Sequence, residues 1–342
     1  MHSPQEYIKN NMKLFLAPDE EFLKVDYKGI QKKAFQSTVR EVSSLTIIYK
    51  KDTKVRKKEV FLKTGGDQYE TYSAYTSLYE NMAGTTAQKS MPRFYAYDKT
   101  TNTLYMEYLR GTPAKYGVLK NACFPFVGNS KEGSFFEELG VWLRTFHDKN
   151  KTAETVGIQQ LASYALTALE FTENFTAQEK AVVRTSIQAF REKYKQANFS
   201  KVQNHNDFTL RNILKGKNRF YIIDWDATQH PLFDTYAPIW NDITSFYINT
   251  MSMSRFAPVI SRNKTEGWCK SFLRGYFTDY ADNNERITDF IWFFILMHSL
   301  GCIGDRDSFA VYKNVKCIKS YMSDWFKPFV LNVTIKKVEN TK

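Results

Sequence analysis

Two acidic residues and an amide are spaced between residues 202 and 226 in a way that suits phosphate chemistry. Asp207 and Asn212 lie before the polar turn at residues 215–218, and Asp224 ends the strand-like run that follows this turn. We expect a hairpin across that turn to bring Asp207, Asn212 and Asp224 close together. Carboxylate and amide oxygens are ligands that Mg²⁺ prefers, so the pattern predicts a site for magnesium and phosphate.

Phosphoryl transfer requires a group that orients and deprotonates the attacking hydroxyl, a magnesium site and a cation for the donor phosphates. Asp207 could serve as the base, and Asn212 and Asp224 could hold the metal. Lys63, at the end of an apolar strand pattern, stands where the cation is needed. A carboxylate on the next helix should fix this lysine, and Glu70 is the first candidate. Glu80 is the fallback.

At these residues the sequence resembles the aminoglycoside phosphotransferase and choline kinase-like family, a branch of the protein-kinase-like fold. Residues 205–212 match the catalytic loop H-x-D-x-x-x-x-N, and residues 223–226 match the metal-binding segment I-D-[FW]-[EDG]. Residues 139–147 look like the family's L-G-x-x-L-x-x-[LF]-H helix.

The resemblance implies a role for each matching residue. Asp207 would be the catalytic base, with Asn212 and Asp224 as magnesium ligands. Lys63 would contact ATP phosphates. The implied hinge, which reads adenine through backbone groups, consists of Glu107, Tyr108 and Leu109.

The sequence departs from the family in its phosphate-covering loop. No G-x-G-x-x-G occurs, and residues 35–40 would supply donors from Ser37 and Thr38 instead, which leaves the choice between ATP and GTP open. The aspartate that braces the catalytic loop has two candidates, Asp234 and Asp242, with a slight preference for Asp234.

The elements that must position these residues change character near residue 111. Residues 45–49 and 59–63 read as a hairpin joined by a basic connector, residues 69–82 as a helix, and residues 93–97 and 104–109 as a second hairpin. Helical patterns dominate after Gly111, among them a capping box at Thr176 and Glu179. The expected class is α+β, a bilobal protein-kinase-like fold with a β-rich N-lobe at 1–110 and a larger helical C-lobe at 111–342.

The composition is that of a globular protein with a positive excess. The chain has 342 residues and a formal charge of +12. Six cations lie between Lys50 and Lys58, but no nucleic-acid-binding motif accompanies them, so we favour a solvated hairpin tip over a nucleic-acid site. Peripheral association with anionic surfaces is a further alternative.

Cysteine spacing and hydropathy point to an intracellular protein. The four cysteines form no C-x-x-C pair, which favours reduced thiols over a disulfide framework or a zinc site. No signal-peptide pattern opens the chain, and the apolar run at 290–303 is short for a transmembrane helix, so we expect a buried core helix and a cytoplasmic location.

The favoured hypothesis is an ATP- and Mg²⁺-dependent kinase that phosphorylates a hydroxyl of a small molecule or glycan, such as a sugar, an aminoglycoside or a choline-type acceptor. The short interval between Asp226 and Asp234 argues against a protein substrate. Four aromatic residues after position 235 could contact the acceptor, although core packing explains most of them equally well: Trp240, Tyr247, Trp268 and Trp292. The alternatives are a catalytically inactive kinase-like binding or scaffold protein and a basic nucleic-acid-binding protein.

Overall fold

The chain folds into two compact units. The computed structural model describes residues 3–35, 38–66, 68–123, 131–171, 175–225, 236–256, 260–304 and 331. The first, here called the sheet unit, comprises Met1–Ala114 and Asn212–Ala227. The second, the helical unit, comprises Lys115–Arg211 and Thr228–Lys342. We expected all of 111–342 in the helical lobe, whereas residues 111–114 and 212–227 belong to the sheet unit.

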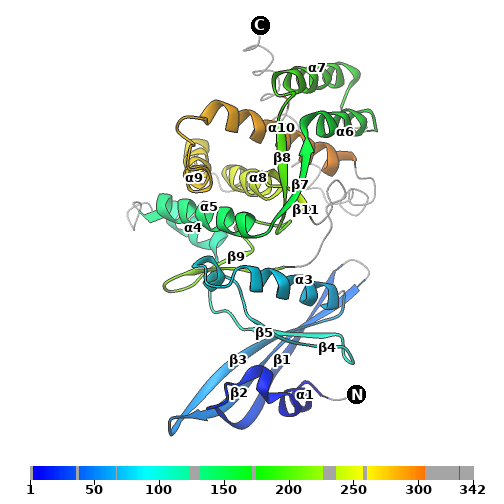
Figure 1. Ribbon diagram of the computed structural model, residues 1–342. Helices are drawn as coiled ribbons and strands as arrows, with labels where there is room; N and C mark the ends of the chain where they lie inside the picture. The colour runs from blue at the N-terminus through cyan, green and yellow to red at the C-terminus, as the bar shows by residue number, and fades with distance from the viewer. Residues whose placement is uncertain are drawn as a thin grey trace. The chain divides into compact units, whose positions relative to one another are not determined.

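The sheet unit is built on five antiparallel strands in the order β1-β2-β3-β5-β4 (Figure 1). The strands are β1 (Glu21–Phe35), β2 (Thr38–Lys51), β3 (Lys54–Thr64), β4 (Phe94–Asp98) and β5 (Thr103–Glu107). Helices α1 (Pro4–Asn10) and α2 (Met12–Phe15) precede the sheet, and α3 (Gln68–Asn81) and the short η1 (Ala87–Ser90) lie between β3 and β4. Both predicted hairpins and the predicted helix are confirmed. Strand β1 was not predicted as a separate strand, because charged residues interrupt its apolar pattern.

The basic segment between β2 and β3 is strand rather than connector. Lys50 pairs with Val55 and Lys51 with Lys54, so only Asp52 and Thr53 form the turn. Both turn residues have positive φ, +48° and +66°, which is the backbone of a two-residue turn that follows the twist of a hairpin. The predicted connector was too long, because the charged side chains at its ends belong to strands but interrupt the apolar pattern by which a strand is recognised. The charges lie on an exposed hairpin, as expected.

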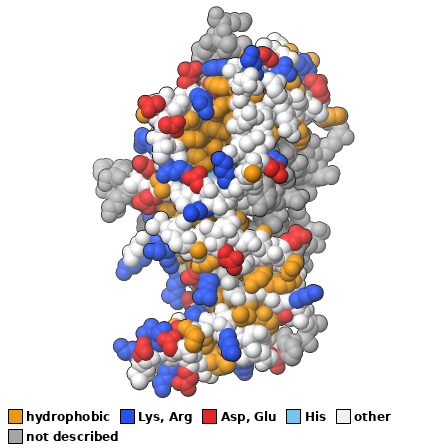
Figure 2. All heavy atoms as spheres, in the orientation of Figure 1, with side chains coloured by type: hydrophobic (Ala, Val, Ile, Leu, Met, Phe, Trp, Pro, Cys, Tyr) orange, Lys and Arg blue, Asp and Glu red, His pale blue; other side chains and the backbone are white. Residues whose placement is uncertain are grey.

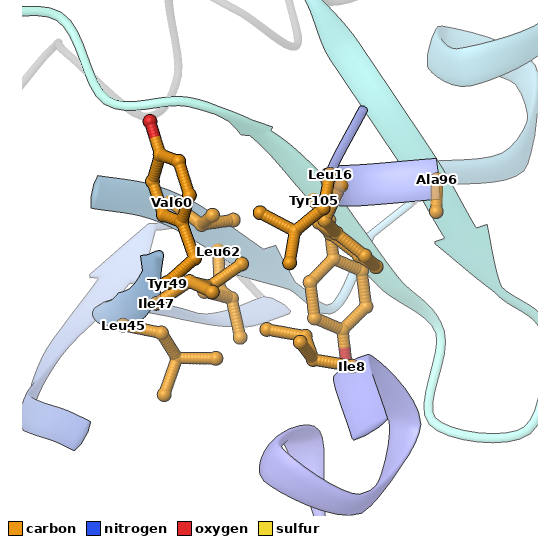
Figure 3. Close-up of a cluster of buried hydrophobic side chains, with 10 residues drawn as sticks. Ile8, Leu16, Leu45, Ile47, Tyr49, Val60, Leu62, Ala96 and Tyr105 are labelled. Atoms are coloured by element: carbon orange, nitrogen blue, oxygen red, sulfur yellow. The ribbon is translucent and has the colours of Figure 1, made fainter. Parts of the chain in front are cut away.

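Alternation along β3 assigns its side chains to two faces. Val60 and Leu62 are buried in a core with residues of α1, α2, β2 and β5, which Figure 3 shows around Tyr105. Phe61 and Lys63 point to the opposite face, where Met106 and Leu104 are their cross-strand partners. One strand therefore stabilises the sheet with one set of residues and presents a lysine with the other.

A second, smaller sheet completes this unit. Its strands, in the order β10-β9-β6, are β6 (Thr112–Pro113), β9 (Ile213–Lys215) and β10 (Phe220–Ile222). Strands β9 and β10 form the hairpin predicted across residues 215–218, with Ile213 opposite Ile222.

The helical unit contains seven helices among its described residues (Figure 1). They are α4 (Ala114–Cys123), α5 (Lys131–Lys149), α6 (Ile158–Phe171), α7 (Ala177–Lys193), α8 (Trp240–Phe256), α9 (Arg262–Tyr276) and α10 (Asn284–Gly304). The predicted capping box starts α7, because the Thr176 hydroxyl accepts from the Glu179 N–H and the Glu179 carboxylate accepts from the Thr176 N–H. A three-stranded sheet, in the order β11-β8-β7, was not predicted; it consists of β7 (Lys151–Gly157), β8 (Asn198–Gln203) and β11 (Tyr236–Pro238).

Helices α5 and α9 approach each other closely at two glycines. A Cβ on Gly140 would lie 2.1 Å from the Phe272 carbonyl oxygen, and one on Gly275 would lie 2.0 Å from the Glu137 carbonyl oxygen. Real Cβ atoms do not occupy such positions, so both residues must be glycine for the helices to pack at this distance.

The apolar run at 290–303 lies within α10, and the side chains at 290–297 are buried. The prediction of a core helix is therefore confirmed. Within the described ranges, no helix has the length and apolar character needed to cross a membrane.

Candidate active site

A cavity of about 390 Å³ lies in the sheet unit, between the face of the large sheet that carries Lys63 and the β9–β10 hairpin. Val42 and Phe61 contribute to it from β2 and β3, and Leu214 and Ile223 from the hairpin segment. The cavity is therefore apolar on two sides. Two apolar walls that face each other suit a flat ring such as a nucleobase.

Three charged residues line this cavity: Lys63, Glu107 and Asp224. The Lys63 Nζ lies 3.5 Å from an Asp224 carboxylate oxygen. The lysine side chain is 13% exposed and the aspartate side chain 46% exposed, so the carboxylate can reach a ligand from solvent. Asp224 also has a left-handed backbone, with φ +66°, which costs about 1 kcal/mol for a residue other than glycine. Strain at a polar, ligand-facing residue is typical of functional sites.

The hairpin fixes Asn212 beside Asp224. The Ile223 N–H donates to the Asn212 carbonyl oxygen at 2.9 Å, so the two residues that carry the oxygen ligands flank the ends of paired strands. Trp225 then anchors the segment, because its indole N–H donates to the Ile222 carbonyl at 2.9 Å and its ring packs edge-on against Tyr75 of α3. The predicted closeness of Asn212 and Asp224 is supported by this geometry.

The donor set of Asn212 and Asp224 fits magnesium. One carboxylate and one amide oxygen are hard ligands, and Mg²⁺ in phosphate-binding sites commonly takes only one or two protein ligands beside phosphates and water. Over the described ranges, no group of three or more His, Cys, Asp or Glu side chains is arranged to hold a metal. A site at these two residues therefore depends on the phosphates for its remaining ligands.

The predicted hinge lies along one edge of the cavity, which Glu107, Tyr108 and Leu109 all line. The Glu107 N–H donates to the Arg93 carbonyl at 2.7 Å, and the Tyr108 N–H donates to the Glu59 carbonyl at 3.3 Å. By contrast, no hydrogen bond joins the Leu109 N–H to another residue in the described part of the chain. A backbone donor is thus left at the rim of the apolar cavity.

Three other predicted residues of the nucleotide site stay predictions. Glu70 lies in the first turn of α3 with an exposed side chain, while its neighbour Thr71 lines the cavity. Lys63 forms an ion pair with Asp224, and its expected contact with Glu70 stays a prediction. Ser37 lies outside the described residues, and Thr38 begins β2 without a described side chain.

In the helical unit, a buried carboxylate holds the loop that contains Asp207. Asp242, which is fully buried near the start of α8, accepts from the His205 N–H at 2.7 Å and from the Asn206 N–H at 2.9 Å. The bracing residue is therefore Asp242. Asp234, the slightly preferred candidate, lies outside the described residues.

A buried histidine extends this network toward α9. His147 Nε2 lies 3.2 Å from Asp242 Oδ2, and Nδ1 lies 2.7 Å from the Tyr276 hydroxyl. Because each of these side chains is buried, their polar atoms must be satisfied within the protein. The histidine of the predicted L-G-x-x-L-x-x-[LF]-H segment thus acts as a structural link between α5, α8 and α9.

Local backbone geometry explains Asn206. Its φ is +65°, a left-handed conformation that glycine and asparagine accept more readily than other residues. The Asn241 side-chain amide donates to the Asn206 side-chain oxygen at 3.0 Å and holds it there. Asparagine therefore suits this position in both its backbone conformation and its side-chain contact.

The Asp207 side chain is partly exposed and has a cationic neighbour. An Arg211 guanidinium nitrogen donates to an Asp207 carboxylate oxygen at 2.6 Å, across one turn of the chain. The Asp207 N–H donates to His205 Nδ1 at 3.3 Å, which supports a structural role for that histidine. Asp207 belongs to the helical unit and Asn212 and Asp224 to the sheet unit, so their expected meeting at one phosphate stays a prediction.

Aromatic packing also holds the loop that contains Asp207. Phe208 is fully buried and stacks on Trp142 of α5, with ring centroids 5.8 Å apart and planes 3° from parallel. Three of the aromatic residues considered for acceptor contact are also core residues: Trp240 stacks on Phe294, Trp268 stacks on Phe136, and Trp292 packs against Phe190. Core packing thus accounts for these three residues.

No family model matches the chain. No curated protein matches it.

Several solved structures are similar in fold. A choline/ethanolamine kinase family protein from Mesorhizobium loti is 12% identical with a TM-score of 0.54, over 96% of this chain and 94% of that one. A glucosamine kinase is 13% identical with a TM-score of 0.54, over 96% of this chain and 79% of that one. A glucosamine kinase solved with glucosamine, ADP and inorganic phosphate is 12% identical with a TM-score of 0.54, over 94% of this chain and 82% of that one.

Identities this low establish the architecture alone. The β-sheet N-terminal part and the helical C-terminal part confirm the predicted class, and the chain therefore has the kinase-like fold that these small-molecule kinase structures share.

Proposed function

We propose that this protein is an ATP- and Mg²⁺-dependent phosphotransferase that phosphorylates a hydroxyl group of a small molecule or glycan. The observation that carries the proposal is the Lys63–Asp224 pair at an apolar cavity that also has an unpaired backbone donor at its rim, within the described residues. An apolar slot, a cation and an accessible carboxylate are the features that a nucleoside triphosphate with magnesium requires.

The nucleotide would be held by the sheet unit. The base would lie between the apolar walls, and the Leu109 N–H and the Glu107 carbonyl would bind its edge. Lys63 would release Asp224 and contact phosphate oxygens instead. Glu70 would hold the lysine in place, and Ser37 and Thr38 would donate hydrogen bonds to the phosphates. Asn212 and Asp224 would hold magnesium, which would neutralise charge on the phosphates when bound.

The helical unit would supply the base. Asp207 would accept the proton of the acceptor hydroxyl while the hydroxyl oxygen forms a bond to the γ-phosphorus and the bond to the ADP oxygen breaks. Asp242 would keep the loop backbone in place during this step, because it binds two consecutive amides of the loop. Arg211 would orient the Asp207 carboxylate before the acceptor binds.

The names of the structural neighbours, which include choline, ethanolamine and glucosamine, support an acceptor that carries both a hydroxyl and an amino or ammonium group. An amino alcohol or amino sugar is therefore the first acceptor to test. A cytoplasmic location is part of the proposal, because the reaction consumes ATP.

The test measures ADP release with ATP and Mg²⁺ across a panel of choline, ethanolamine, glucosamine, neutral sugars and aminoglycosides. We expect one acceptor class to stimulate ADP release. Asp207→Asn should lower kcat by about 10³-fold, since general-base catalysis typically contributes 10²–10⁴-fold. Glu170→Gln, which changes an exposed carboxylate of the same unit, is the matched control and should keep full activity.

Two results would contradict the proposal. Full activity in Asp207→Asn would remove this residue from catalysis. ATP binding without ADP release for every acceptor would favour the alternative of an inactive kinase-like binding protein.

A further inference from the structure

We propose that the helical unit carries a second binding site, for a small organic anion with a flat apolar part. The site is a groove of about 920 Å³ between the end of α5, β8, the end of α9 and the start of α10, here called the α5–α10 groove. This proposal does not depend on the proposed kinase activity.

Aromatic side chains form the apolar part of the α5–α10 groove. Trp240 stacks on Phe277, with ring centroids 5.3 Å apart, and packs edge-on against Phe290 at 5.4 Å. All three residues line the groove. Figure 2 shows hydrophobic side chains gathered on the helical unit in the region where Figure 1 places α9 and α10, with Lys and Arg side chains beside them. Trp240 and Phe290 are 3% and 4% exposed and form the floor of the groove, whereas Phe277 is half-buried and offers the accessible ring on which a flat ligand can stack.

Cations border the same groove. Arg144, Lys151, Lys195 and Arg286 line it, and none of the four forms an ion pair with another described residue. Lys193 also lines it, but its ammonium group already pairs with Glu285 at 3.1 Å and Asp289 at 2.9 Å.

The acids of the groove do not cancel these cations. Two carboxylates line it, those of Asp148 and Asp279. The Asp279 carboxylate accepts a hydrogen bond from the Asn283 side chain at 2.7 Å, just before α10 begins. The positive end of this 21-residue helix adds to the excess. Four unpaired cations against two carboxylates leave a positive site, and the complementary ligand is an anion.

The α5–α10 groove is separate from the proposed acceptor site. Asp207 does not line it. His147 and Tyr276 do, and His147 contacts Asp242, which in turn binds the backbone of the catalytic loop. A ligand in the groove would therefore contact His147 and Tyr276, which reach the loop through Asp242. It would not contact the Asp207 carboxylate.

The experiment uses calorimetric titration of the full chain with phenyl phosphate, inorganic phosphate and phenol, each with and without saturating ADP. We expect phenyl phosphate to bind at least fivefold more tightly than either fragment, because only this probe combines the ring with the charge. Its affinity should persist with ADP present, since the groove lies in the helical unit and the proposed nucleotide cavity lies in the sheet unit.

Charge variants locate the site. The double variant Lys195→Gln/Arg286→Gln should weaken phenyl phosphate binding at least tenfold. The matched control is Arg184→Gln/Arg262→Gln, which removes the same charge from the same unit outside the groove and should leave the affinity unchanged.

Four outcomes would overturn the proposal. These are no binding of phenyl phosphate at millimolar concentration, equal binding of inorganic phosphate, loss of binding with ADP, and equal weakening in both double variants. The third would assign the probe to the nucleotide cavity and the fourth to general charge attraction. None of them would affect the proposed kinase activity, which Asp207→Asn tests separately.

Discussion

The two units place their polar groups in opposite environments. In the sheet unit, Lys63 and Asp224 line a cavity and are 13% and 46% exposed. In the helical unit, the polar groups that hold the loop containing Asp207 are internal: Asp242 is 0% exposed and His147 1% exposed.

This difference in exposure suggests that the polar groups of the sheet unit bind a ligand, whereas those of the helical unit hold a loop in position. A partly hydrated ion pair contributes little to stability, so Lys63 and Asp224 can exchange each other for a ligand at small cost. A buried carboxylate that holds two amides and a histidine cannot lose its partners without leaving polar groups unsatisfied. We therefore expect substitutions in the helical unit to act through stability and those at the cavity to act through binding.

The largest effect should come from the contact between α5 and α9. Gly140→Ala would place a methyl group 2.1 Å from the Phe272 carbonyl oxygen, so the helices must separate. We expect the free energy of unfolding to fall by about 3 kcal/mol or more, measured by urea denaturation. Gly267→Ala on α9 is the matched control, because its Cβ would meet nothing within 4 Å, and it should be neutral or stabilising. Equal destabilisation by both variants would show that the close approach does not matter.

The next effect should come from the buried carboxylate. Asp242→Asn keeps the shape but turns one acceptor into a donor that faces a loop amide or His147. We expect the free energy of unfolding to fall by about 2–3 kcal/mol, because at least one buried group loses its hydrogen bond. Glu170→Gln, at an exposed ion pair in the same unit, is the control in the same denaturation series. A wild-type transition in Asp242→Asn would remove the distinction between the two units.

A smaller effect on stability is expected at the cavity. Lys63→Ala should change the free energy of unfolding by less than about 1 kcal/mol, because its ion pair is partly hydrated. The affinity for ATP should fall at least tenfold, since the phosphates lose their cation. Both quantities can be measured by thermal unfolding with and without nucleotide, with Lys51→Gln at the exposed Asp19 pair as the control. A large loss of stability in Lys63→Ala without any loss of ATP affinity would contradict the expectation that residues at the cavity act through binding.

The smallest effect is expected at Cys269, which is buried in the helical unit. Burial raises the pKa of this thiol, so the reactive thiolate is scarce at pH 8 in the folded state. We expect no labelling of Cys269 by iodoacetamide in native protein at pH 8, and full labelling in urea, measured by mass spectrometry of the peptide. Rapid native labelling at pH 8 would show that this part of the helical unit opens readily.

The sequence by itself determined the local features of this protein. The run at residues 59–63 predicts a strand that ends in Lys63, and β3 places Val60 and Leu62 in the core and Phe61 and Lys63 at the cavity. The turn at residues 215–218 predicts the hairpin that places Asn212 near Asp224. The Thr176–Glu179 pattern predicts a helix start. These features depend on residues close in the chain, where spacing alone fixes geometry.

Only the tertiary structure decided which distant residues meet. Asp242 reaches the amide of His205 across 37 positions, and His147 reaches Asp242 across 95. Lys63 pairs with Asp224, far along the chain, and Trp268 stacks in the core on Phe136, a residue of another helix. Such partners are selected by helix packing and sheet topology, because many acids and aromatic residues satisfy the local pattern equally well. The physical reason is that the type of a residue determines which groups its side chain can bind, whereas tertiary packing determines which groups lie close enough to be bound.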